Sequence, residues 1–108
     1  MSFRQRDAPN WMVSIDEELK AAKAAKAAVN QLSTAATPTK LMLMRTLRSA
    51  NHLAVVNLGS GWGALNEARG IVRIAFSSVI HGPRTPQRIA KAKAAIDAWI
   101  RELEAGRG

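Results

Sequence analysis

Residues 85–103 read TPQRIAKAKAAIDAWIREL, and this stretch has the clearest helical pattern in the chain. Thr85 is a residue type that caps helix N-termini, and Pro86 suits the first helical position because proline lacks the N–H that would be unpaired there. The apolar residues that follow recur every three or four positions, which predicts one apolar stripe along an amphipathic helix. The stripe consists of Ile89, Ala92, Ile96, Trp99, Ile100 and Leu103.

The same periodicity recurs in three earlier segments, which turn residues separate from one another. The first helix is expected to begin at Ser14, because Ser14 and Glu17 have the spacing of a capping box. The second has Thr37 as its expected N-cap and Pro38 at its first position. The third covers about residues 64–80, where helical periodicity outweighs several β-branched residues that would suit a strand.

Four amphipathic helices with short connections predict an all-α fold, a single-domain helical bundle. We expect the bundle over residues 14–105, after a polar N-terminal arm at residues 1–13 and before a frayed C-terminus at residues 106–108. A chain of 108 residues is long enough to bury a core without a metal or a disulfide. The sequence has no cysteine, which excludes a disulfide scaffold and a thiol nucleophile.

The chain carries no pattern that directs it to a membrane. The N-terminal arm is polar and therefore unlike a signal peptide, and the apolar runs are far shorter than the ~20 residues that span a bilayer. We expect a cytoplasmic protein that does not bind membranes.

Residues that suggest catalysis are few. His52 and His81 lie in different segments, with no carboxylate at the spacing of a catalytic triad or a metal site. The loop Gly59–Gly63 (GSGWG) lacks the Lys and Ser/Thr that follow a phosphate-binding loop, so we interpret it as a helix connection. We expect a protein that is not an enzyme and that has no metal and no cofactor.

The acidic residues have ordinary structural interpretations. Asp16, Glu17 and Glu18 lie where the dipole of the first helix favours negative charge. Glu67 lies early in the third helix, close in sequence to Arg69, so that dipole placement or a local ion pair is expected.

The positive charge is concentrated on the predicted helices. The net charge is +8, and it divides into +1 for residues 1–37, +4 for residues 38–82 and +3 for residues 83–108. Glu67 is the only acid between Leu19 and Ile96. The residues expected to contact a nucleic acid or an acidic partner are Arg45, Arg48, His52, Arg69, Arg73, Arg88 and Lys91.

Two functional hypotheses follow from this pattern. The first is a small binding protein that docks an ordered positive face on a polyanion, with nucleic acid as the preferred partner. The alternative is a protein-interaction module: an adaptor, an inhibitor of an acidic-surfaced protein, or a homo-oligomer. Its expected interface anchors are Leu41, Met42 and Trp62, although Trp62 also suits the core.

Overall fold

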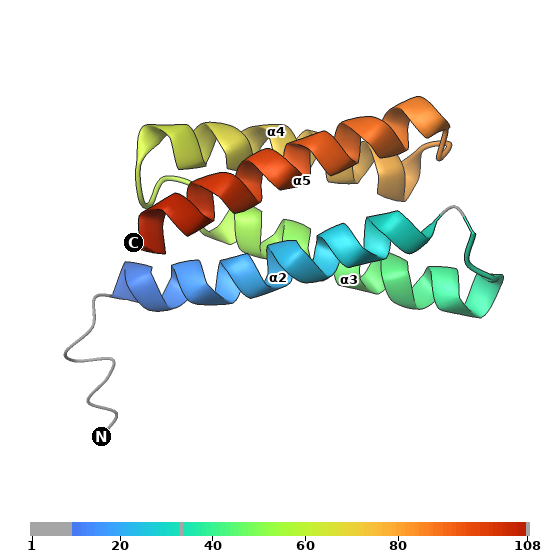
Figure 1. Ribbon diagram of the computed structural model, residues 1–108, viewed down its shortest axis with the longest axis horizontal. Coiled ribbons are helices and arrows are strands. Elements are labelled where there is room, and N and C mark those ends of the chain that lie inside the picture. Colours follow the sequence, from blue (N-terminus) through green and yellow to red (C-terminus); the bar gives the residue numbers. More distant parts are fainter. Residues whose placement is uncertain (1–9, 33, 108) are drawn as a thin grey trace, which may run out of the picture.

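The described part of the chain folds into a bundle of four helices. The computed structural model describes residues 10–32 and 34–107, and the side chains of all of these except 10–14 and 107. Within those ranges there are four helices and no strand: α2 (Asn10–Leu32), α3 (Thr37–Val56), α4 (Gly63–His81) and α5 (Pro86–Arg107). Consecutive helices run antiparallel, and α2 also packs against α5, so the helices form a closed ring around the core (Figure 1). The predicted all-α bundle is confirmed.

The core forms where the four apolar stripes meet. Every stripe residue predicted for α5 is buried, and so are several alanines on α2 and α3. The largest buried side chain, Trp99, packs edge-to-face on Phe76, with ring centroids 6.0 Å apart and an interplanar angle of 78°. The centre of the bundle therefore joins α4 to α5 through an aromatic pair.

The starts of α2 and α3 differ from the predictions, whereas those of α4, expected at about residue 64, and of α5 agree. α2 begins at Asn10, before the expected cap Ser14, because residues 11–13 contain no glycine or proline to stop a helix. α3 has Ala36 as its extended N-cap residue, with no side-chain cap, so Thr37 is already helical. The cap of α5 is as predicted, because Thr85 Oγ1 accepts a hydrogen bond from the backbone N–H of Arg88 at 3.2 Å.

The last helix also extends further than expected. α5 continues through Gly106 to Arg107, where fraying was predicted. The ring of Trp62 lies against Gly106 so closely that a Cβ there would collide with it, and this contact holds the final turn. Most of the expected N-terminal arm (residues 1–9) and Gly108 lie outside the described residues. None of the described helices is long and apolar enough to cross a membrane.

Candidate functional site

The basic residues predicted to form one positive surface lie in three different places. Arg45, Arg48, His52 and Arg73 are exposed on α3 and α4, and we call them the basic face. The other three lie elsewhere. Arg69 is inside the bundle, whereas Arg88 and Lys91 border a groove between α4 and α5.

The basic face is built by two adjacent antiparallel helices. Arg45, Arg48 and His52 recur at helical spacing and form one exposed row on α3, as predicted. Arg73 lies on the side of α4 that faces α3, because Arg69, one turn earlier, bonds to the carbonyl oxygen of Asn57 at the end of α3. α3 contains no acidic residue, and among the described residues no ion pair involves the basic face.

The opposite side of the bundle has a different charge pattern. Lys23 of α2 pairs with Glu104 of α5 at 3.4 Å, and Lys26 pairs with Asp97 at 2.8 Å. These cations are balanced by acids on the neighbouring helix, whereas the cations of the basic face are not. The basic face therefore carries positive charge that no acid on a neighbouring helix balances.

The prediction that Arg69 contacts a partner is wrong, because its side chain is 1% exposed. Its guanidinium forms a two-pronged ion pair with Glu18 of α2: Nε donates to Oε2 at 2.8 Å and Nη2 donates to Oε1 at 2.7 Å. Glu18, expected to serve only the helix dipole, is fully buried. Glu67 is exposed and does not pair with Arg69.

The buried ion pair is surrounded by donors and acceptors from α4, from α5 and from the connection between α3 and α4. Glu18 also accepts hydrogen bonds from Trp99 Nε1 at 2.6 Å and from Asn57 Nδ2 at 2.9 Å. Arg69 Nη1 lies within hydrogen-bonding distance of the carbonyl oxygens of Asn57 (2.8 Å) and Ser60 (2.6 Å) and of Asn66 Oδ1 (3.0 Å). A buried charge is tolerated only when it is paired in this way.

This network organises the α3–α4 loop. Gly59 and Gly61 adopt positive φ angles of 95° and 86°, which glycine reaches without strain, and the loop carbonyls turn towards Arg69. Gly59 N–H donates to Asn66 Oδ1 at 2.8 Å. The glycine-rich loop is therefore a helix connection, as interpreted from the sequence, and its backbone is held by the arginine.

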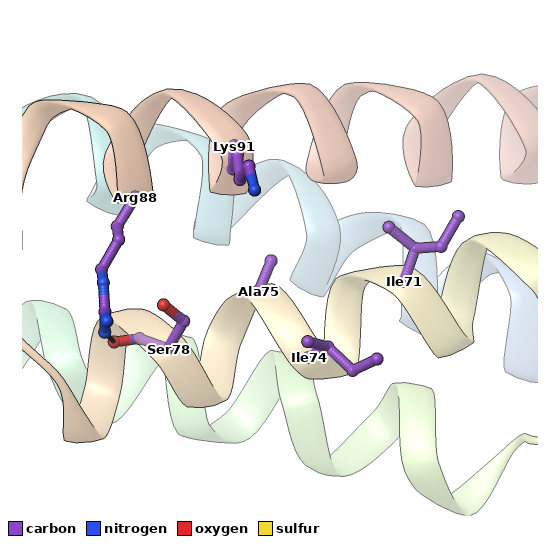
Figure 2. A pocket seen from close by; sticks show the side chains of 6 residues that line it. All are labelled: Ile71, Ile74, Ala75, Ser78, Arg88 and Lys91. Carbon is purple, nitrogen blue, oxygen red and sulfur yellow. Dashed lines mark hydrogen bonds between the residues drawn. The ribbon is translucent and has the colours of Figure 1, made fainter.

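Arg88 and Lys91 line a groove of about 390 Å³ between α4 and α5 (Figure 2). Its wall on α4 includes Ile71 and Ile74, which are 53% and 68% exposed. Arg88 reaches across to α4, where Nη1 lies 3.5 Å from the carbonyl oxygen of Ser78. The groove therefore combines an apolar wall with a cationic end.

The three predicted interface anchors separate into two kinds. Leu41 and Met42 are 63% and 67% exposed on α3. Trp62 is half-buried, packs against the core and donates from Nε1 to Glu102 at 3.0 Å. The contacts of Trp62 favour the core interpretation, whereas Leu41 and Met42 remain available to a partner.

The described residues contain no group of three or more His, Cys, Asp and Glu side chains that could hold a metal ion. His52 and His81 are both exposed, on different helices. Comparison of the chain with known protein families, curated proteins and solved structures finds no significant match.

Proposed function

We propose that the protein binds nucleic acid through the basic face. The observation that carries the proposal is the set of exposed arginines on α3 and α4 that have no acidic partner among the described residues. Arginine on a rigid helix suits phosphate, because its guanidinium donates paired hydrogen bonds in a fixed geometry. The expected mechanism is neutralisation of backbone phosphates with little reading of base sequence.

The size of the basic face sets the expected salt dependence. Three arginines that each neutralise about one phosphate give a slope of log K against log [salt] of about −2.7. The affinity for duplex DNA should therefore fall about 40-fold between about 50 mM and about 200 mM salt. Fluorescence anisotropy with a labelled duplex measures both values.

A pair of charge-matched variants tests whether the basic face is responsible. The variant Arg45→Gln/Arg48→Gln/Arg73→Gln should lose most of its affinity and its salt slope. The control Lys20→Gln/Lys23→Gln/Lys26→Gln removes the same charge from the exposed strip on α2 and should bind almost as the unmodified protein does. Equal losses in the two variants would show that net charge alone acts, and the proposal would then fail.

The exposed apolar residues of α3 favour a second candidate function, a protein-interaction module. Leu41 and Met42 lie next to Arg45, so this part of α3 fits an acidic partner that also presents apolar side chains. Capture experiments with and without nuclease discriminate the two functions, because only a protein partner remains bound after digestion. For either function we propose a cytoplasmic location, which the cysteine-free sequence supports.

A further inference from the structure

The outer face of α4 has apolar side chains that no other helix covers. Ile71 and Ile74 project from it more than half exposed, and among the described side chains they are the two most exposed large apolar residues outside α3. Ile71 also lines a second hollow further along α4 and α5, so the groove of Figure 2 continues in both directions from it. A contiguous apolar surface with polar edges is typical of a binding site.

The two ends of this groove have opposite charge. Arg88 and Lys91 border one end. Glu67 and Glu102 border the other, together with a single cation, Arg101. Among the described residues no ion pair links these side chains to one another. The groove therefore has an excess of positive charge at one end and of negative charge at the other.

This arrangement is complementary to itself. If a second α4 lies antiparallel on the first about a two-fold axis between Ile71 and Ile74, each Ile71 meets Ile74 of the second copy. The same operation places Glu67 at the level of Ser78 of the second copy, beside the Arg88 and Lys91 end. In this dimer the isoleucines of the two copies contact each other, and the acidic end of each groove lies against the basic end of the other. Because of the two-fold symmetry, each of these contacts occurs twice.

The space beside Ile74 is compatible with such packing. Gly70, one turn before Ile74, has no atom within 4 Å of the position its Cβ would occupy. An acidic peptide would match the Arg88 and Lys91 end but would be repelled by Glu67. A second copy satisfies both ends at once.

We propose that the protein forms a two-fold symmetric dimer through α4 and the α4–α5 groove. This inference does not depend on nucleic-acid binding. A helix of 19 residues is about 28 Å long. With flanking groups from α5, the interface would bury about 1,100 Å² in total, at the low end of specific interfaces. Interfaces of this size form weak complexes, so we expect a dimer that dissociates in the micromolar concentration range.

Sedimentation velocity of the full chain tests the dimer, over a range from about 1 µM to about 500 µM that brackets the expected dissociation constant. The mass should rise from that of the 11.7 kDa chain to twice that value. A charge swap then tests the pairing. Glu67→Lys alone and Lys91→Glu alone should each weaken association at least about tenfold, because like charges then face each other. The double variant should return to within about threefold of the unmodified protein.

Two further variants separate the proposed interface from general effects. Ile74→Ser should weaken association about as much as a single charge reversal, because it removes the central apolar contact. Val56→Ser makes the corresponding change at an apolar residue of α3 that is 60% exposed, and it should leave association unchanged. Circular dichroism checks that each variant is folded. A chain that stays monomeric throughout, or a charge swap that fails to restore association, would overturn the proposal.

Discussion

Replacing Glu18 with glutamine tests how much the buried ion pair contributes to stability. Glutamine keeps the shape of the side chain but turns one acceptor oxygen into an NH₂ group. That NH₂ would face two donors, either Arg69 Nη2 and Asn57 Nδ2, or Arg69 Nε and Trp99 Nε1. The substitution also leaves the arginine charge buried without its counter-ion.

The magnitude follows from this geometry. Removing one partner of a buried ion pair costs about 3–5 kcal/mol, because the remaining charge stays desolvated. For a chain of 108 residues, 1 kcal/mol corresponds to about 4 °C in Tm. The variant Glu18→Gln should therefore melt about 12–20 °C lower than the unmodified protein, as followed by circular dichroism.

Lys26→Gln provides the matched control. It breaks the ion pair with Asp97, which has a similar distance of 2.8 Å but is about half exposed. Exposed pairs contribute at most about 1 kcal/mol, so the control should change Tm by no more than about 4 °C. If the two variants melted at the same temperature, the reasoning that burial makes the Glu18–Arg69 pair important would be refuted.

A double variant examines the pair as a unit. Glu18→Met/Arg69→Met removes both charges, so it should lose less stability than the two single substitutions added together. It should still be less stable than the unmodified protein, because the carbonyl oxygens of Asn57 and Ser60 lose their donor. Urea denaturation of the unmodified protein, of Glu18→Met, of Arg69→Met and of the double variant measures this coupling.

Two other pairs of variants test the helix ends and glycines by thermal denaturation. Gly106→Ala should lower stability by about 1–3 kcal/mol, because the new methyl group collides with the ring of Trp62. At Gly70, within α4, the added methyl group would point into open space. Gly70→Ala should therefore raise stability by about 0.5–1 kcal/mol, because alanine favours the helix more than glycine does. A loss at Gly70 as large as that at Gly106 would contradict the packing argument. Thr85→Ala should cost about 1 kcal/mol because it removes a side-chain cap. Thr37→Ala, at a helical position without a cap bond, should change stability by less than about 0.5 kcal/mol, and equal losses at the two threonines would contradict the assigned caps.

The helices were predictable because local patterns determine them. The apolar stripe from Ile89 to Leu103 repeats every three or four residues, and all of its members are buried. The exposed row of Arg45, Arg48 and His52 followed from the same spacing. Helix ends were predicted less well, because Ala36 and Gly106 are held by backbone geometry and by tertiary contacts.

The buried ion pair was missed because charged residues were assumed to be exposed. Its two members are 51 residues apart, so no local pattern links them. The sequence does contain a signal for each one. Glu18 lies three residues after Ile15 and four before Ala22, and Arg69 lies four residues after Leu65 and three before Val72. An acid and an arginine, each on a core stripe of a different helix, indicate a buried pair.

The ring of helices has a consequence for the connectivity of the chain. Because α2 packs against α5 as well as α3, the start of the first described helix lies beside the end of the last one (Figure 1). Each helix therefore has two neighbours in space, including the two that lie at opposite ends of the described sequence. A circular permutant that joined α5 to α2 and opened the connection between α4 and α5 would keep all four helix contacts.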